Sequence, residues 1–338
     1  MDWGLGHVSR TIPIIKNLLK RGHTIITCGN ENIKTIYKEE FKSLKHINFK
    51  GYNPKYSRGN NQGLAMIKQS SKFFNLIKEE GKFADKIATE MNLDYIISDN
   101  RFGFRSKYTT NIFICHQINI QGPLLLKIMM RKINYGFIKK FDQCWIPDLN
   151  GKEKLSGKLS INKFKNCNYI GTLSRFNKVC KPKEKWTYKY LAILSGPEPQ
   201  RSILEKKIIQ AFNELDAQCA IIQGVPSNKK LTLNKIDFFP HLKTIDFFNI
   251  IDNSETIICR SGYSSIMDLS TLQKQVILIP TPGQTEQEYL SKHHQIKSNV
   301  TTLKQSAFSL DKIKKPTPIK QTTNDSQLMI NVFKSCGL

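Results

Sequence analysis

Two segments in the second half of the chain combine glycine, hydroxyl side chains and arginine directly after apolar runs. They are 195–201, Ser-Gly-Pro-Glu-Pro-Gln-Arg, and 260–268, Arg-Ser-Gly-Tyr-Ser-Ser-Ile-Met-Asp. A glycine turn that opens a helix lets an anionic group approach the backbone, and the free N–H groups of the helix N-terminus attract it. The segments therefore predict a phosphate-binding site, with an arginine in each as counter-charge. The candidate residues are Ser195, Gly196, Arg201, Arg260, Ser261, Gly262 and Ser264.

A third segment of the same kind follows the apolar run 276–279. It spans 280–287, Pro-Thr-Pro-Gly-Gln-Thr-Glu-Gln, and adds Gln284, Glu286 and Gln287 as candidate polar groups. Two adjacent turns of this kind could hold both phosphates and the ribose of a nucleotide. Asp268 lies one turn into its predicted helix, where a carboxylate can accept hydrogen bonds from ribose hydroxyls.

The N-terminal half carries two further groups of candidates. Gly4, Gly6 and His7 are typical of a glycine turn opening a helix, although a tight turn with a helix-capping histidine explains them equally well. Polar residues also follow the apolar runs 95–98 and 112–115, and ligands of open α/β sheets bind outside the carboxyl ends of strands. These residues are Asp99, Asn100 and Arg101 after the first run, and His116, Gln117 and Asn119 after the second.

Apolar bursts alternate with longer amphipathic segments, which predicts βα units feeding parallel sheets. With 338 residues we expect two domains and a cleft between them. The predicted division is an N-terminal Rossmann-like acceptor domain over 1–176, a polar linker over 177–189, a C-terminal donor domain over 190–309, and a tail over 310–338 with a closing helix near 328–333. The predicted strands are 23–28, 47–51, 95–98, 112–116 and 143–147 in the first domain, and 190–194, 219–223, 244–247, 256–259 and 276–280 in the second.

Only three residues precede the glycine turn at Gly4. In a doubly wound domain the strand leading into that turn is central, and leaving it out would expose two inner strand edges. We therefore expect that the first strand is missing, and that Met1 is an internal methionine of a longer natural protein or that translation begins upstream of it.

The formal charge of +25 would suit nucleic acid, an anionic membrane or phosphorylated substrates. The lysines are scattered and no nucleic-acid-binding motif accompanies them, so we expect no nucleic-acid partner. The eight cysteines include no CxxC pair, which argues against zinc and disulfides and favours a reducing cytosol. No apolar stretch approaches the roughly 20 residues of a membrane-spanning helix, so we expect a cytoplasmic protein.

The segment 124–141 could contact the inner face of the plasma membrane. It places basic residues among Leu, Ile, Met and Phe and contains one glycine but no acidic residue. Such a helix could lie on an anionic leaflet near a lipid-linked acceptor, although a helix covering the sheet with its lysines in water explains the pattern equally well. The basic residues are Lys127, Arg131, Lys132, Lys139 and Lys140.

The segments 260–268 and 280–287 resemble the nucleotide-sugar signature of GT-B glycosyltransferases, specifically the group around the bacterial N-acetylglucosaminyltransferase that makes peptidoglycan lipid II. The runs 2–7, 194–201 and 280–287 also look like a set of uncharacterised predicted glycosyltransferases. The resemblance implies an α/β fold with two Rossmann-like domains facing across a cleft. It implies that Asp268 binds the donor ribose, where the family usually has Glu, and that Glu286, Gln287 and Gln284 hold the sugar.

In the N-terminal half, 116–119 resembles a His-Glu-Gln-Asn acceptor motif, and 4–7 takes the place of a longer glycine-rich loop. The resemblance implies acceptor binding by Gly4, Gly6, His116, Gln117 and Asn119. Asn100 and Arg101 join them as acceptor-binding candidates because they follow the neighbouring predicted strand.

The implied reaction is an inverting transfer from a nucleotide-sugar, a UDP-sugar in this group, to the hydroxyl of a glycan or lipid-linked acceptor. An imidazole suits a general base, so His7 is the first candidate and Asp99 the second. Helix N-termini with Arg201 or Arg260 could stabilise the leaving diphosphate without a metal, and no DxD motif is present. No cofactor is expected beyond the donor substrate. Two alternatives stay open: a nucleotide-sugar epimerase of the same architecture, and a non-catalytic nucleotide-binding or nucleic-acid-binding protein.

Overall fold

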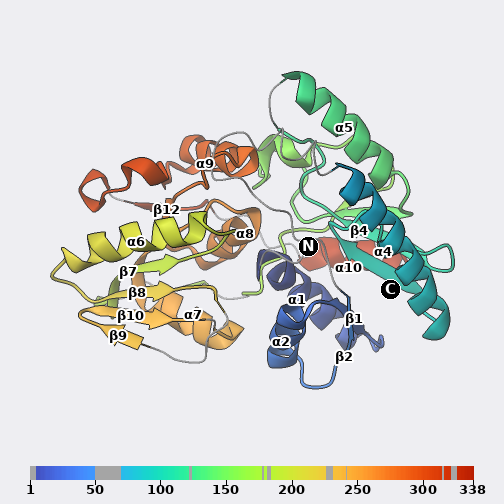
Figure 1. Cartoon of the computed structure of the whole chain (residues 1–338), viewed down its shortest axis with the longest axis horizontal. Coiled ribbons are helices and arrows are strands. Elements are labelled where there is room, and N and C mark those ends of the chain that lie inside the picture. Colours follow the sequence, from blue (N-terminus) through green and yellow to red (C-terminus); the bar gives the residue numbers. More distant parts are fainter. Residues whose placement is uncertain are drawn as a thin grey trace. The chain divides into compact units, whose positions relative to one another are not determined.

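A computed structural model describes residues 5–49, 70–121, 124–176, 179–180, 184–225, 231–240, 242–313, 316–320 and 326–338 (Figure 1). The chain forms two compact units. Unit 1 comprises Tyr52–Thr172 and Thr323–Leu338, together with Met1, and unit 2 comprises Asp2–Gly51 and Leu173–Thr322. The domain bounds predicted from the sequence, 1–176, 177–189, 190–309 and 310–338, stay a prediction.

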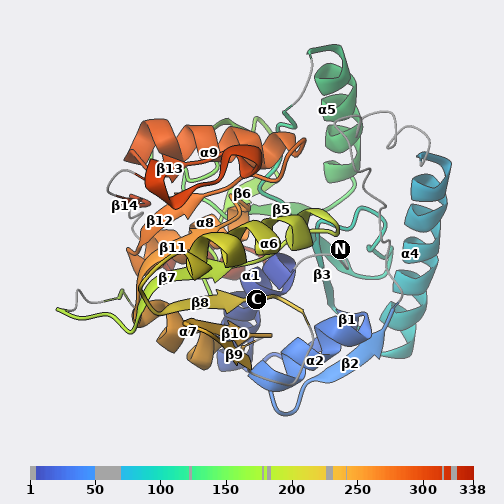
Figure 2. The same ribbon diagram turned by 60° about the vertical axis from the view of Figure 1, so that its left-hand side comes forward.

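Unit 2 is built on one large, mostly parallel sheet with the strand order β13-β12-β11-β7-β8-β10-β9, and β14 pairs with β12 (Figure 2). All residues of β8 and β10 are buried, as expected of parallel strands covered on both faces. The strands are β7 (Tyr188–Ile193), β8 (Cys219–Ile222), β9 (Leu231–Leu233), β10 (Ile236–Phe239), β11 (Ser254–Cys259), β12 (Gln275–Leu278), β13 (Thr301–Thr302) and β14 (Thr317–Pro318).

Four helices of unit 2 follow the strands of this sheet. They are α6 (Gln200–Asn213), α7 (Thr244–Asp252), α8 (Tyr263–Leu272) and α9 (Thr285–Ser298). Leu204, Ile208 and Phe212 of α6 lie in one apolar core with residues of β7, β8, β10, β11 and β12. The short helices η2 (Gln305–Ala307) and η3 (Leu310–Lys312) come after β13.

The N-terminal part of unit 2 contains α1 (Leu5–Lys20), β1 (Ile26–Gly29), α2 (Glu31–Glu40) and β2 (Lys45–Asn48). Strands β1 and β2 pair in parallel as a sheet of their own among the described residues. Asn30 caps α2, because its side chain accepts a hydrogen bond from the Ile33 N–H. Helix α1 packs against α8, the helix that follows β11 of the large sheet.

Unit 1 is a parallel sheet of four strands in the order β3 (Tyr95–Asp99), β4 (Thr110–Ile114), β5 (Gln143–Ile146) and β6 (Cys167–Tyr169). Its helices are α4 (Ser70–Glu90), α5 (Leu124–Ile138) and α10 (Ser326–Ser335), and the short helix η1 (Gly157–Ser160) lies between β5 and β6. Helix α10 follows unit 2 in the chain but belongs to unit 1, where the rings of Phe333 and Trp145 stack at 5.0 Å.

One predicted strand was wrong. Residues 244–247 begin helix α7, in which Phe247 and Ile251 are buried one turn apart and Ile245 is exposed. A short apolar run does not separate a strand from a helix by itself, and here the spacing of four residues decides for the helix. The strand at this place in the sheet is β10, which the sequence analysis missed together with β6, β9, β13 and β14.

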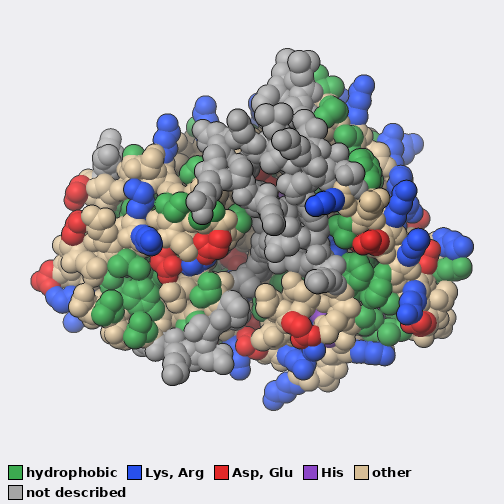
Figure 3. All heavy atoms as spheres, viewed as in Figure 1, with side chains coloured by type: hydrophobic (Ala, Val, Ile, Leu, Met, Phe, Trp, Pro, Cys, Tyr) green, Lys and Arg blue, Asp and Glu red, His purple; other side chains and the backbone are tan. Residues whose placement is uncertain are grey.

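Lysine and arginine side chains are spread over the face seen in Figure 3, with acidic side chains between them. This distribution agrees with the scattered lysines of the sequence. In the part of the chain that the structure describes, no helix combines the length and the apolar character that crossing a membrane requires.

Candidate functional site

The large sheet of unit 2 reverses its strand order between β7 and β11. From β7 the chain proceeds outward to β8 and β10, and it then returns to β11 on the other side of β7. The turns after β7 and β11 therefore lead away from each other. Such a place, where the strand order of a parallel sheet reverses, is called a switch point, and open α/β sheets bind ligands there, outside the carboxyl ends of the strands. The segments 195–199 and 260–262 are these two turns, and 279–284 follows the neighbouring strand β12.

Arg260 is the buried centre of this edge, with an exposed fraction of 1%. Its Nη1 donates to the carbonyls of Ile279 (3.3 Å) and Pro280 (3.4 Å). Its Nη2 donates to the Gln200 carbonyl (2.8 Å) and to Oε1 of Gln305 (2.6 Å). Arg260 therefore ties the start of α6 to the end of β12.

No described carboxylate lies within ion-pair distance of Arg260, and its hydrogen-bond partners among the described residues are neutral oxygens. Burial lowers the pKa of Arg260 to about 10, which leaves the guanidinium protonated at neutral pH. Buried cations are ordinarily paired. The edge of the sheet thus carries a positive charge that no carboxylate of the described residues compensates.

Arg201 has the opposite environment. Its Nε lies 2.6 Å from Oε1 of Glu198, and its Nη1 lies 2.9 Å from Oε2 of Glu205. The backbone N–H of Ser202 also donates to Glu198, at 3.3 Å. Because two carboxylates neutralise Arg201 and one of them meets the first turn of α6, this helix start offers less positive charge than the sequence suggested.

The start of α8 is the open helix N-terminus at this edge. Its cap residue is Gly262, with no side-chain cap bond and no acidic residue in the first turn. A Cβ added at Gly262 would meet no described atom within 4 Å, so a ligand can approach the backbone there. The first turn of α9, by contrast, already carries Glu286 and Glu288.

Gly196 and Thr281 lie close together across the turns after β7 and β12. Gly196 has a φ of +97°, a conformation that glycine adopts without strain, and a Cβ added to it would lie 3.8 Å from Oγ1 of Thr281. The Oγ1 of Thr281 and the Nε of Arg260 are buried and have no hydrogen-bond partner among the described residues. Buried polar atoms without partners are uncommon in proteins. Ser195, half-buried, precedes this glycine.

Three other predicted residues hold the turns after β11 and β12 together. Oγ of Ser261 donates to the Gln287 carbonyl at 2.8 Å. Oε1 of Gln287 accepts from the Thr281 N–H at 2.9 Å, and its Nε2 donates to Oε1 of Gln284 at 2.6 Å. The structure therefore brings Ser261, Gln284 and Gln287 together as a scaffold, with the half-buried Glu286 in the same helical turn.

The first turn of α1 meets the first turn of α8 through Ser264. Oγ of Ser264 donates to the Gly6 carbonyl at 2.8 Å. His7, the next residue, is half-buried in the first turn of α1. Gly4 lies outside the described residues. The structure thus brings Gly6 and His7 to the first turn of α8.

Asp268 contacts the segment that enters unit 2. Its Oδ1 accepts from Oγ of Ser174 (2.9 Å) and from the Arg175 N–H (3.2 Å), and its Oδ2 lies 3.2 Å from Nε of Arg175. Burial raises the pKa of this carboxyl, and Arg175 opposes the shift. Its predicted role at the donor ribose stays a prediction.

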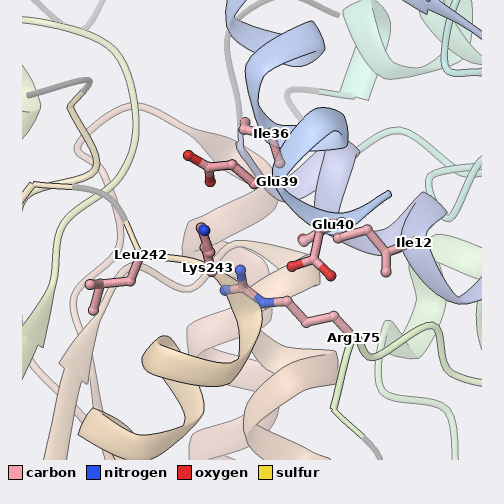
Figure 4. A pocket seen from close by; sticks show the side chains of 8 residues that line it. Ile12, Ile36, Glu39, Glu40, Arg175, Leu242 and Lys243 are labelled. Carbon is pink, nitrogen blue, oxygen red and sulfur yellow. The ribbon is translucent and has the colours of Figure 1, made fainter. Parts of the chain in front are cut away.

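A pocket in unit 2 contains none of the predicted site residues. Figure 4 shows the Arg175 side chain beside Glu40 and Lys243 at this pocket. Glu40 accepts from the Thr244 N–H at 3.1 Å, so a protein carboxylate already meets the N-terminus of α7. The remaining lining residues are Ser9, Ile12, Ile36, Glu39 and Leu242.

In unit 1, β3 and β4 pair in parallel, so Asp99, Asn100 and His116 lie at the same edge of the sheet, as predicted. Asn100 takes a φ of +55°, which asparagine tolerates better than most residues. Arg101 forms an ion pair of 2.9 Å with the buried Glu80, which also accepts from the Gly103 N–H at 3.0 Å.

The second group at this edge follows β4. Asn119 is engaged by the loop after β5, since its N–H donates to the Leu159 carbonyl at 2.8 Å. Its Oδ1 also accepts from the Tyr135 hydroxyl at 2.5 Å. The Gln117 carbonyl accepts from Nδ2 of Asn134 at 3.1 Å. Arg101 and Asn119 are therefore bound to neighbours within unit 1.

Sequence reasoning missed Asp148, which follows β5 and is fully buried. Its carboxylate accepts from the N–H groups of Leu149 (2.8 Å), Leu155 (3.0 Å) and Ser156 (3.0 Å), and it thereby shapes the loop after β5. The sequence analysis did not identify Gln305 either, because no local motif marks its position after β13. Thr281 belongs to the segment 280–287, but nothing in the sequence indicates that its side chain is buried.

Residues 190–323 match the model of the glycosyltransferase family 28 C-terminal domain. The matched stretch contains the switch point, Arg260, the start of α8 and the scaffold of the turns after β11 and β12. The large sheet of unit 2 is therefore similar to the C-terminal domain of glycosyltransferase family 28. No curated protein sequence matches the chain.

Similar solved structures extend the likeness from the family 28 domain to the whole chain. The glycosyltransferase SnogD from Streptomyces nogalater superposes with a TM-score of 0.62 at 10% identity, covering 99% of this chain and 92% of SnogD. Acinetobacter baumannii MurG gives 0.50 at 12% identity, covering 98% and 87%. A Listeria monocytogenes protein assigned as a UDP-N-acetylglucosamine 2-epimerase gives 0.54 at 10% identity, covering 98% and 85%. At these identities the likeness shows the fold, and it confirms the predicted α/β fold of the GT-B type.

Proposed function

We propose that the chain is a glycosyltransferase that moves a sugar from a nucleoside-diphosphate donor, a UDP-sugar, to an acceptor hydroxyl. One observation carries this proposal. In the region that matches the family 28 model, the buried guanidinium of Arg260 has no carboxylate partner among the described residues, and Arg260 directly precedes the turn to Gly262, the cap of the open N-terminus of α8. A diphosphate brings the negative charge that this edge lacks. The choice of UDP rests on the resemblance to the family and on the similar fold of the Listeria monocytogenes protein that is assigned as a UDP-N-acetylglucosamine 2-epimerase.

The same charges would favour the reaction as well as binding. When the sugar leaves the diphosphate, negative charge develops on the leaving phosphate oxygen. Fixed positive groups that are already in place stabilise this charge without reorganising. Arg260 and the backbone N–H groups at the start of α8 would supply them, so we propose a metal-independent, inverting transfer.

His7 is the proposed general base for the acceptor hydroxyl, with Asp99 as the second candidate. The bond from Ser264 to the Gly6 carbonyl supports His7, because it holds the first turn of α1 at the first turn of α8. Asp99, Asn100 and His116 at the edge of the unit 1 sheet are the proposed contacts of a glycan or lipid-linked acceptor.

Helix α5 supports a contact with an anionic membrane at the cytoplasmic face. Ile128, Met129 and Ile133 are 43 to 48% exposed, and the exposed Lys132 lies among them on the helix. The remaining turns bury Phe137 and Ile138 in unit 1. Apolar side chains flanked by lysine suit the boundary of a leaflet that carries negative headgroups.

The experiment is a thermal-shift screen of UDP-, GDP-, dTDP- and CMP-sugars against the chain and its Gly262→Ala variant. A methyl group at position 262 meets open space, so the variant should keep its unfolding temperature but bind the donor at least tenfold more weakly. Gly136→Ala is the matched control, because its Cβ also meets open space but lies on α5 in unit 1.

The outcomes separate the candidate functions. Binding of one nucleotide class, weakened in Gly262→Ala alone, supports donor binding at α8. Conversion of that donor to an epimer without any acceptor would favour the epimerase. No binding of any donor by well-folded protein would contradict the proposal and leave a non-catalytic role. Activity abolished by EDTA would contradict metal independence.

A further inference from the structure

Gln305 contacts Arg260 and Gln200 at the edge of the sheet that carries the candidate donor site. It is 6% exposed and belongs to η2, the turn after β13. Its Oε1 accepts from Nη2 of Arg260 at 2.6 Å, and its Nε2 donates to Oε1 of Gln200 at 2.8 Å. A guanidinium can only donate, so the amide oxygen must face Arg260.

Three half-buried arginines in the described part of the chain have carboxylate partners. Arg101 pairs with Glu80, Arg175 with Asp268, and Arg201 with two glutamates. Glutamate has the same shape as glutamine and would give Arg260 an ion pair in place of its hydrogen bond to the Gln305 amide oxygen. An uncompensated buried charge costs folding free energy. The amide therefore preserves the charge at some expense of stability.

We propose that Gln305 acts through Arg260: as a neutral hydrogen-bond acceptor, it leaves the positive charge of the guanidinium available to the diphosphate of the donor. This inference rests on the proposed function. The attraction between two unit charges falls only with the inverse of their distance, and at a partly buried site salt and water screen it incompletely. Neutralising Arg260 should therefore be visible in binding even without direct contact.

The test compares Gln305→Glu and Gln305→Met with the unchanged chain. Titration calorimetry measures the affinity of each protein for two ligands. The first is the nucleoside diphosphate that binds best among UDP, GDP and dTDP, and the second is the corresponding nucleoside. In Gln305→Glu the affinity for the diphosphate should fall about tenfold or more, while nucleoside affinity stays within about twofold and the unfolding temperature is equal or higher. Gln305→Met, which adds no charge, should keep the diphosphate affinity within about threefold.

Gln275→Glu is the matched control. It adds the same charge to the same sheet at the start of β12, where Gln275 accepts a bond of 3.2 Å from Thr256. It should leave diphosphate affinity unchanged. Two outcomes would mean a merely structural role and overturn the inference. One is an equal loss of diphosphate affinity in Gln305→Glu and Gln305→Met, and the other is an equal loss of affinity for the diphosphate and the nucleoside in Gln305→Glu.

Two further results are also decisive. If Gln305→Glu does not fold, a tenfold loss in Gln305→Met still overturns the inference. If the unchanged chain binds no nucleoside diphosphate, the proposed function fails first; if it binds and Gln305→Glu binds equally well, only the role of Gln305 fails.

Discussion

The hydroxyl of Ser264, in the first turn of α8, donates a hydrogen bond of 2.8 Å to the carbonyl of Gly6, in the first turn of α1. The two residues are 258 positions apart in the chain. Their contact is close, since a Cβ added to Gly6 would lie 3.1 Å from both Cβ and Oγ of Ser264. The glycine is therefore needed for the approach of the two helices.

Gly6→Ala should lower the free energy of unfolding by about 1–2 kcal/mol, because the added methyl group forces the two helices apart. Urea unfolding measures the change. In a Ser264→Gly background the crowding is gone, and the higher helix propensity of alanine should make the same substitution neutral or stabilising. An equal loss in both backgrounds would show that the crowding is not the cause.

Asp268→Ala should destabilise the fold by about 3–5 kcal/mol, because it leaves the half-buried Arg175 without its carboxylate. Glu90→Ala is the comparison: it removes an exposed ion pair with Lys86 and should cost less than about 0.5 kcal/mol. Urea unfolding of both variants gives the two values. If Asp268→Ala is as stable as the unchanged chain, the contact with Arg175 is not structural, and the ribose role gains weight.

Alkaline pH should destabilise the chain through Cys259, whose burial raises its pKa to about 12. The unfolded thiol loses its proton near pH 9 while the folded thiol keeps it. The stabilisation is complete below the unfolded pKa and is lost as pH rises toward 12, by about 1.4 kcal/mol per pH unit. Urea unfolding between pH 8 and 10 should show a shallower decline for Cys259→Ala. Parallel declines would contradict the prediction.

Replacing Ile128, Met129 and Ile133 together by serine should reduce binding to vesicles of anionic phospholipid at least fivefold, because each loses exposed apolar area. Cosedimentation measures binding, and the unfolding temperature should not change. Ile245→Ser is the control, since Ile245 is 70% exposed but lies on α7 in unit 2. Equal vesicle binding by the triple variant and the unchanged chain would remove α5 as the membrane contact.

The sequence predicted the strands that are continuous apolar runs, such as β8 and β11, because burial on both faces leaves a pattern readable within a few residues. It failed for α7 and β10, where similar apolar runs take different structures. Which run becomes the strand depends on pairing with β8, a contact that no local pattern encodes.

The site was predictable as a set of turns but not as a set of contacts. The glycines and Arg260 fell where strand-to-helix turns place them, since such turns have a local signature. Gln305 had none, because its role depends on an arginine 45 residues away. Asp268 was expected at a ribose, yet its partner Ser174 lies 94 residues earlier. Side-chain partners at such distances follow from packing alone.

The stacking of Phe333 on Trp145 has a consequence for synthesis of the chain. Ribosomes deliver the strands of unit 1 early and helix α10 only after all of Leu173–Thr322 in unit 2. Domains generally fold as units while the chain is being made. Trp145 of β5 therefore lacks its stacking partner Phe333 until translation reaches α10, so unit 1 completes its packing after the chain of unit 2 has been made.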